Sequence, residues 1–468
     1  MVVWAGSWFL RNRVNLRNAL LLAASYYFYG SWNWRFLSLL LFSTGVDYVC
    51  ARMIGPKEPG VERGGRERLI LTVSIGVSLG LLGFFKYYGF FVDSAVATLA
   101  RFGITAHLTT LKIVLPVGIS FYTFQTMSYT IDVYRGHLLP ERSLLNFALY
   151  VAFFPQLVAG PIERASSLLP QCNNPTRITW PMISSGTYLI CSGLFKKVVL
   201  ADNAAKVVET MFTEASPGGW VVVLGVYAFW VQVYGDFSGY SDIARGSARC
   251  MGFELMKNFQ QPLFATSPAD FWARWHISLS TWLRDYLYFP LGGSRKGVLR
   301  TYVNLMLVMV LGGLWHGAAW TYVVWGTFHG VILCVHRAMK PWMDQYLNPG
   351  GAIMRRAWHV GRVILFFQVT AVGLLLFRSR SVEQIGEMFR GLMRWRLREL
   401  FTNMNSLVIV AACMMILLGV QLAKELSNDD YVLLRLPLPA RAMLYAAAIL
   451  GFVAFGEFYG EQFIYFQF

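Results

Sequence analysis

The residues best suited to chemistry are histidines in apolar surroundings. His316 lies in the triad Trp315-His316-Gly317, and every other residue from 305 to 319 is apolar or glycine. An imidazole that loses its hydration favours the neutral form, and a neutral imidazole can accept a proton. Ionisable residues inside membrane helices are functional candidates. His316 is therefore a candidate general base, and the alternative is a buried structural histidine bonded to a neighbouring carbonyl.

The sequence around His316 is rich in glycine. Gly312, Gly313 and Gly317 carry no side chains, so a substrate or another backbone can approach closely there. A further histidine, His329, lies on the next apolar segment, where His336 seven residues later shares its helix face. We expect His329 to line the same site and His336 to lie at the membrane interface.

A second polar block occupies residues 234–242 and contains two carboxylates and several hydroxyls. Carboxylates are unfavourable near hydrocarbon unless they face water, a ligand or one another. Helical spacing places Asp236 and Tyr240 on one face, and Asp242 and Arg249 on another. The block predicts either a lined cavity or an internal network of ion pairs and hydrogen bonds.

A third block begins at Ser267-Pro-Ala-Asp270, which is typical of a helix start with a serine N-cap and proline at the first position. The pattern predicts one helix that starts at Pro268 and runs through residues 271–288. On that helix His276, Ser280 and Arg284 share a stripe within a mostly aromatic surface. The stripe indicates a lined cavity, and the alternative is a half-exposed helix at the membrane interface.

The elements that position these residues are expected to be membrane helices. The chain has 468 residues, of which 56% are hydrophobic and only 14% charged, whereas about 25% is usual in soluble domains. Its apolar runs are continuous rather than alternating, which indicates helices and not strands. We expect ten to thirteen embedded helices, several of them short, tilted or re-entrant. Candidate spans are residues 18–32, 36–54, 69–92, 111–131, 183–199, 220–234, 303–315, 321–335, 360–377, 406–422 and 440–455.

The formal net charge of +16 comes from 41 basic and 25 acidic residues. The basic residues fall in short loops, which fits the positive-inside rule and not nucleic-acid binding. A turn at residues 33–34 would place two basic clusters in the cytoplasm, namely Arg11, Arg13 and Arg17 before it and Lys57, Arg63, Arg66 and Arg68 after it. Further basic loops occur at residues 295–300 and 390–398, where the charge is interpreted as a topology signal. Docking of an anionic, phosphate-bearing donor there is the alternative.

The six cysteines stand alone in the sequence, so the spacing implies neither a metal site nor a disulfide framework. Residues 1–10 lack a basic start and a cleavage motif, and we expect them to form a retained interfacial helix. No linker or internal repeat divides the chain. One membrane domain over residues 1–468, with its polar core at about 232–330, is the simplest organisation.

Five motifs together resemble the membrane-bound O-acyltransferase family, and in particular its bacterial alginate O-acetyltransferase branch. They are Arg274-Trp-His-Ile-Ser-Leu-Ser-Thr-Trp-Leu-Arg-Asp-Tyr-Leu-Tyr-Phe-Pro-Leu-Gly-Gly293, Gly313-Leu-Trp-His-Gly-Ala318, Trp325-Gly-Thr-Phe-His-Gly330, Phe153-Phe-Pro-Gln-Leu-Val-Ala-Gly-Pro161 and residues 234–242. The resemblance covers nearly the whole chain.

The resemblance implies a fold and a reaction. The family fold is a ring of tilted and re-entrant helices around a central transmembrane tunnel. The branch implies a multi-pass protein of the bacterial inner membrane that uses cytoplasmic acetyl-CoA as donor, with no bound cofactor and no metal. The acetyl group would pass to hydroxyls of an exported polysaccharide, with periplasmic partners of the SGNH-hydrolase type.

The resemblance also assigns residues. His316 corresponds to the family's essential histidine, and His276 corresponds to its second motif position. His316 would act as general base, while His276, with Ser280 behind it, would hydrogen-bond the thioester carbonyl or position the acceptor. The supporting or tunnel-lining residues are expected to be Asp236, Tyr240, Asp242, Ser280, Arg284, Trp315 and His329.

The C-terminal residues Phe463-Ile-Tyr-Phe-Gln-Phe468 form an F-x-Y-x-x-F pattern. This pattern resembles the ending of the small partner protein of the related D-alanyl transferase, whose tyrosine is proposed to carry the acyl group. By that resemblance Tyr465 would accept acetyl before the polysaccharide does. The alternative is an aromatic anchor at the membrane interface.

Other functions stay open at this point. Within the enzyme class they are D-alanylation of teichoic acid and acetylation of peptidoglycan, cellulose or another glycan. A transporter or channel also has broken helices and polar residues at membrane depth. Transporters commonly carry an inverted repeat, and none is evident in this sequence.

Overall fold

The computed structural model describes residues 2–57, 62–105, 111, 113–347, 349–458, 460 and 463. Over this part of the chain the secondary structure is helical, and the only strand-like pairing is a bridge between Phe259 and Trp275. Seven of the described helices are long and apolar enough to cross a membrane. The expected all-α polytopic fold is confirmed, while the count of ten to thirteen embedded helices stays a prediction.

Contacts group the chain into two compact units, residues 1–190 with 243–256 and residues 191–242 with 257–468. The chain passes between them inside α8 (Trp180–Phe195), inside α10 (Gly219–Cys250) and again between Met256 and Lys257. The single membrane domain stays a prediction. The other helices of the first unit are α1 (Val2–Phe9), α2 (Val14–Ile54), α3 (Gly65–Leu82), α4 (Tyr88–Arg101), α5 (Ile119–Arg135), α6 (Leu144–Ala152) and α7 (Ala165–Asn173). Those of the second are α9 (Asp202–Phe212), α11 (Pro268–Arg274), α12 (Ile277–Leu283), α13 (Val298–His316), α14 (Trp320–Tyr346), α15 (Ala352–Arg378), α16 (Val382–Gly391), α17 (Leu397–Thr402), α18 (Met404–Ser427) and α19 (Leu438–Phe455).

The first unit confirms one expectation about α2. Asn33 has extended backbone angles (φ −159°, ψ 107°), so α2 is interrupted where the sequence indicates a turn. Arg17 is fully buried, and its guanidinium donates to the Asn18 side chain at 2.8 Å and to the Cys172 carbonyl at 3.0 Å. Because these donors are satisfied inside the protein, Arg17 is a buried structural residue, and the side of the membrane on which its cluster lies stays a prediction.

Helices α13, α14 and α15 separate the basic loop 295–300 from the basic loop 390–398. Of these three helices, α13 and α15 are long and apolar enough to cross a membrane. The side of the membrane on which each loop lies stays a prediction.

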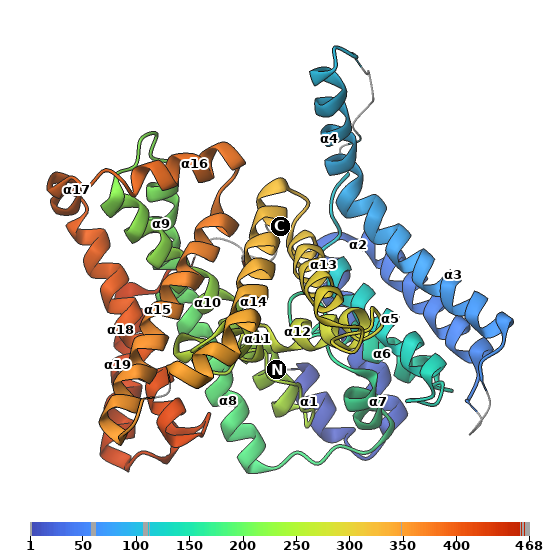
Figure 1. The fold of residues 1–468 in the computed structure, drawn as a ribbon. Coiled ribbons are helices and arrows are strands. Elements are labelled where there is room, and N and C mark those ends of the chain that lie inside the picture. The colour runs from blue at the N-terminus through green and yellow to red at the C-terminus, as the bar shows by residue number, and fades with distance from the viewer. Residues whose placement is uncertain are drawn as a thin grey trace. The chain divides into compact units, whose positions relative to one another are not determined.

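The second unit is built around α10, whose Trp230 and Phe229 are almost completely buried. The Trp230 ring lies 5.8 Å from Phe367 of α15, and the Phe229 ring lies 6.3 Å from Phe377 of the same helix. Helices α13 and α14 run side by side against this core (Figure 1). The unit thereby gathers most of the chemistry-capable residues that the sequence singles out.

The single helix predicted for residues 271–288 is interrupted. Ser267 caps its start as expected, accepting a hydrogen bond from the Asp270 N–H at 3.2 Å. The helix ends at Arg274, restarts at Ile277 as α12, and continues as a π-helical turn over Arg284–Tyr288. Asn258 explains the break, because its backbone carbonyl accepts the Ile277 N–H at 2.9 Å and its side chain accepts the Ser278 N–H at 3.2 Å.

Candidate active site

Two histidines enter the site from the paired helices α13 and α14. His316 is the last residue of α13, and Gly317 ends the helix by donating its N–H to the Gly313 carbonyl at 3.4 Å. His329 lies in the first half of α14. Only 6% of His316 and 3% of His329 is exposed, so both imidazoles are buried.

The glycines near His316 bring the two helices together. A Cβ on Gly313 would lie 2.2 Å from the Tyr322 carbonyl oxygen of α14, and a Cβ on Gly326 would lie 2.4 Å from the Met309 carbonyl oxygen of α13. A Cβ on Gly317 would lie 2.0 Å from the Tyr322 ring. The sequence leaves open whether a substrate or another backbone approaches these glycines. At Gly313 it is the backbone of α14 that does so. Only small residues permit helix contact this close.

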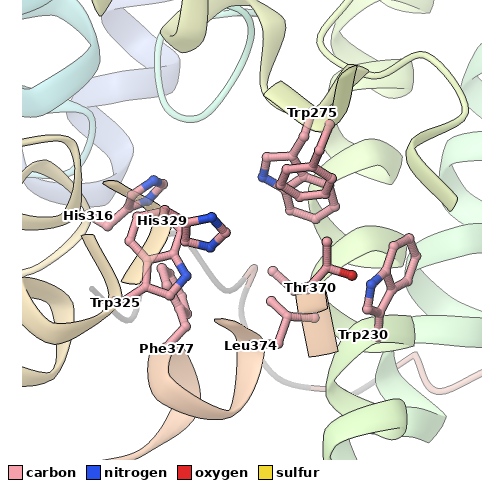
Figure 2. A pocket seen from close by; sticks show the side chains of 10 residues that line it. Trp230, Trp275, His316, Trp325, His329, Thr370, Leu374 and Phe377 are labelled. Carbon is pink, nitrogen blue, oxygen red and sulfur yellow. The ribbon is translucent and has the colours of Figure 1, made fainter. Parts of the chain in front are cut away.

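His316 and His329 line the same small chamber in the second unit (Figure 2). Figure 2 shows both imidazoles beside Trp325, with Trp230, Trp275, Thr370 and Leu374 facing them across the space. The volume of the chamber is about 30 Å³. Its complete lining is Trp230, Val233, Phe271, Trp275, His316, Trp325, His329, Thr370, Leu374 and Phe377.

Aromatic rings surround both imidazoles. The His316 ring centroid lies 5.2 Å from Trp325 and 5.4 Å from Phe377. The His329 ring lies 4.7 Å from Trp325 and 5.2 Å from Trp272. A charged imidazole is disfavoured in such surroundings, which keeps these groups in the form that accepts a proton. A cavity of this size holds about two water-sized groups, which also suits a two-carbon acyl group.

His276 reaches His316 from the break between α11 and α12. It is completely buried, and its ring centroid lies 6.1 Å from that of His316. Burial, and secondarily the proximity of His316, hold the pKa of His276 well below its usual range. Its backbone is left-handed (φ 44°, ψ 53°), an arrangement that costs about 1–3 kcal/mol for a residue other than glycine and is concentrated at functional sites. The Phe237 ring, 4.6 Å away, packs edge-on against it.

A second, polar cavity of about 180 Å³ lies on the other side of the α11 terminus. In the consecutive residues 274–276, Arg274 lines this polar cavity, Trp275 lines the aromatic chamber, and His276 contacts His316. The residues that line the polar cavity are Lys257, Gln260, Gln261, Arg274, Lys424, Glu425, Asn428 and Asp430. Among the described residues the non-glycine positions with positive φ are Gln261, His276 and Asn428. Gln261 and Asn428 line the polar cavity, and His276 directly follows Trp275, which lines the aromatic chamber.

Asp236 and Asp242 do not line the aromatic chamber. Lys197 pairs with Asp236 at 2.8 Å and with Asp202 at 2.7 Å, while Lys196 pairs with Asp242 at 2.7 Å. An internal network is one of the two predictions for residues 234–242, but the spacing within that block does not reveal the two lysines. Their signal is present in the sequence, because adjacent lysines at the end of an apolar run need acidic partners if they are buried.

The other candidate residues have separate contacts. Ser280 Oγ donates to the Trp275 carbonyl at 3.2 Å, and the Arg284 side chain pairs with the adjacent Asp285 at 2.8 Å with about half its surface exposed. The Trp315 ring lies 5.7 Å from His276. None of these three lines the chamber, and their role in a tunnel stays a prediction. Tyr240 contacts Phe463 at 5.1 Å between ring centroids. Tyr465 lies outside the described residues.

A buried carboxyl in the first unit follows the motif at residues 153–161. Glu163 is completely buried and accepts the Met256 N–H at 2.6 Å. Burial raises the pKa of Glu163 to about 7, against the opposing effects of that hydrogen bond and of the charges on Arg245 and Arg164. For metals, the described residues contain no group of three or more His, Cys, Asp or Glu placed to hold an ion.

Comparison with known proteins adds independent information about this site. Residues 137–379 match the model of MBOAT, the membrane-bound O-acyltransferase family. The matched region contains His276, His316 and His329 and the whole lining of the aromatic chamber. It also contains the lining of the polar cavity, apart from the residues of α18 and those that follow it.

Three relatives show how far the similarity extends. The chain is 42% identical over 401 residues to a protein of Pseudomonas putida described as a probable alginate O-acetylase, covering 85% of this chain and 79% of the relative. It is 35% identical over 404 residues to a peptidoglycan O-acetyltransferase of Helicobacter pylori, covering 80% of this chain and 73% of the relative. It is 27% identical over 241 residues to a teichoic acid D-alanyltransferase of Bacillus subtilis, covering 49% of this chain and 61% of the relative.

Proposed function

This chain belongs to the membrane-bound O-acyltransferase family and is an O-acyltransferase, and from that premise we propose that it acetylates an exported polysaccharide of the alginate type. The donor in this proposal is acetyl-CoA. The family membership decides against a transporter or channel. The enzyme is expected in the bacterial inner membrane, as a multi-pass protein.

The observation that carries the proposal is the chamber beside His316. It combines buried imidazoles with a volume of about 30 Å³ and walls that are almost entirely aromatic or aliphatic. Acyl transfer from a thioester needs a base and a site that excludes water, because water would otherwise take the acyl group. The small volume favours acetyl over longer acyl groups.

In the proposed first step, His316 removes the proton from an acceptor hydroxyl as its oxygen attacks the thioester carbonyl. The new C–O bond replaces the C–S bond, and the proton held by the imidazole leaves with the thiolate as the CoA thiol. The products are an acetyl ester and free CoA, with His316 neutral again. General-base assistance of this kind typically contributes about 10²–10⁴-fold in rate.

His276 is proposed to stabilise the negative charge that develops on the thioester oxygen. Its ring lies 6.1 Å from that of His316, so the two imidazoles are close enough to contact one carbonyl group. A neutral imidazole carries one N–H donor and can supply this hydrogen bond. The left-handed backbone at His276 (φ 44°) turns the chain sharply between two helices at this point, so the group is held by the fold.

The polar cavity is proposed to receive the charged part of the donor. Lys257 pairs with Asp430, Arg274 pairs with Glu425, and Lys424 adds a further positive charge. A cavity lined by three cationic side chains suits a phosphate-bearing donor.

The identity of the acceptor rests on the relatives. The P. putida and H. pylori relatives are described as acting on alginate and peptidoglycan, and the identity is higher, over more of this chain, for the former. We propose Tyr465 as the first acceptor, followed by transfer of acetyl from the tyrosyl ester to a sugar hydroxyl, which restores the phenol. A periplasmic protein of the SGNH-hydrolase type is the expected partner for the second step.

The test is mass spectrometry of polysaccharide from cells that carry either the wild-type protein or His316→Ala. The proposal predicts that uronate-linked acetyl esters disappear in the variant while the polymer is still exported. His336→Ala, on the same helix as His329, is the matched control and should leave the esters unchanged. Unchanged esters with His316→Ala contradict the catalytic role, and loss of peptidoglycan esters alone would identify peptidoglycan as the acceptor instead.

A further inference from the structure

The end of α19 and Glu457 are bound against the segment Lys196–Ala201 and the first turns of α9. Asn203 Nδ2 donates to the Phe455 carbonyl at 2.7 Å, and the Glu457 N–H donates to the Val198 carbonyl at 3.1 Å. The Glu457 carboxylate pairs with Lys206 at 2.5 Å. These contacts connect residues about 250 positions apart in sequence, so the end of α19 has a defined place in the second unit.

A buried ionic network lies next to this segment. Lys197 is held between Asp202 and Asp236 at 2.7 and 2.8 Å, and all three side chains are no more than 10% exposed. The segment Lys196–Ala201 is π-helical, a geometry that is rare and frequent at functional sites. Removing charges from water costs several kcal/mol per ion, which favours a use for this network beyond joining two helices.

The described tail residues contact this network directly. The Lys197 ammonium lies 4.8 Å from the centroid of the Phe463 ring, within the range of a cation–π interaction. The Tyr240 ring packs edge-on against the same ring at 5.1 Å. At Gly460 the backbone passes so close that a Cβ would lie 2.7 Å from the Asp202 carboxylate. Gly460 and Phe463 thus both lie against the network.

The helix that binds the tail also contacts the active site. Tyr240 and Phe237 lie three residues apart on α10, about one turn and 4.5 Å along the axis. Tyr240 packs against Phe463, while Phe237 packs against His276 at 4.6 Å. Two ring contacts and one helical turn therefore connect Phe463 to His276.

We propose that Lys197, Asp202, Asp236 and Tyr240 form a docking site for the C-terminal tail of the same chain. The site binds the Phe463 ring and thereby positions the acceptor for transfer at His316. These four are positioning residues and do not touch the reacting atoms. The proposal rests on the proposed function, in which Tyr465, two residues after Phe463, accepts the acetyl group. It gives a role to the polar block at residues 234–242, which lies outside the aromatic chamber.

The test uses the purified full-length protein with Phe463→Ala, because a change in the tail leaves the helix bundle intact. Phe463→Tyr keeps an aromatic ring on Lys197, and Phe458→Ala removes a tail ring that is 69% exposed. The first readout is cleavage of the tail by a glutamate-specific protease, at Glu457 and Glu461. Cleavage should be about tenfold faster in Phe463→Ala, as expected for the loss of one partly buried ring contact, and unchanged in the two controls. Equal cleavage in all four proteins overturns the docking site.

The second readout is the acetyl ester on Tyr465 after addition of acetyl-CoA, followed by mass spectrometry. Phe463→Ala and Lys197→Met should form it about tenfold or more slowly, with the KM for acetyl-CoA unchanged, while Lys197→Arg and Phe463→Tyr restore the rate. Wild-type ester formation with a released tail overturns the positioning role. An absence of ester in the wild-type protein refutes Tyr465 as acceptor in the proposed function, and the protease readout then still decides whether the tail is docked.

Discussion

The walls of the aromatic chamber should set the length of the acyl group. The chamber has a volume of about 30 Å³, which holds about two water-sized groups. In a filled apolar pocket, one extra methylene is worth roughly 1–3 kcal/mol, or about 10–200-fold in kcat/KM. The wild-type enzyme should therefore prefer acetyl-CoA to propionyl-CoA by about 10–200-fold.

Leu374→Ala is the perturbation that tests this limit, because Leu374 lines the chamber from α15 without contacting a histidine in Figure 2. Removal of its three terminal carbons should admit propionyl or butyryl groups and reduce the preference by about tenfold or more. Leu365→Ala is the matched control, since this residue of the same helix is 67% exposed. Release of CoA from acetyl-, propionyl- and butyryl-CoA gives the three kcat/KM values. A wild-type enzyme that uses all three equally, or an unchanged preference in Leu374→Ala, would refute the chamber as the acyl site.

Three further predictions concern residues outside the chamber wall. Glycine tolerates the left-handed backbone at residue 276, so His276→Gly should lower kcat by about 10²–10³-fold with little change in KM. His276→Asn keeps a hydrogen-bond donor and should retain more activity. Equal activity in the two variants would exclude hydrogen bonding by His276. Lys424→Ala should raise the KM for acetyl-CoA several-fold, more at low salt than at high salt, and leave kcat unchanged, which steady-state kinetics at two salt concentrations would check. The pKa of Glu163 is raised to about 7 in the folded protein, so the stability linked to its proton is fully present below about pH 4.5 and is lost as the pH rises through 7. Thermal unfolding from pH 5 to 8 should show a decline of at most about 3 kcal/mol in the free energy of unfolding, and Glu163→Gln should lack this decline. Parallel curves for the two proteins would contradict this assignment.

Local sequence patterns were sufficient for some of these features. The apolar run around His316 and the glycines beside it predict a buried imidazole at a close helix contact, and α13 and α14 have that arrangement. The N-cap at Ser267 and the interruption of α2 at Asn33 also follow from residues adjacent in sequence. In each case the decisive interaction lies within a few residues.

Features that depend on distant partners could not be predicted. The helix over residues 271–288 is broken because Asn258, from a preceding loop, takes the hydrogen bonds that would continue it. Arg284 was placed on the stripe of His276, but that stripe requires an unbroken helix. Asp236 and Asp242 find lysines some 40 residues earlier in the chain, a pairing that helical spacing within residues 234–249 cannot reveal.

The most direct test is the rate of CoA release from acetyl-CoA by the purified enzyme in lipid nanodiscs, measured for wild type, His316→Gln and His336→Gln. If His316 is the general base, the His316 variant should lose activity by about 10²–10⁴-fold, while the more exposed His336 variant on α14 should match the wild type. Activity in His316→Gln within a few-fold of wild type would contradict the assignment of His316 as the base of this O-acyltransferase.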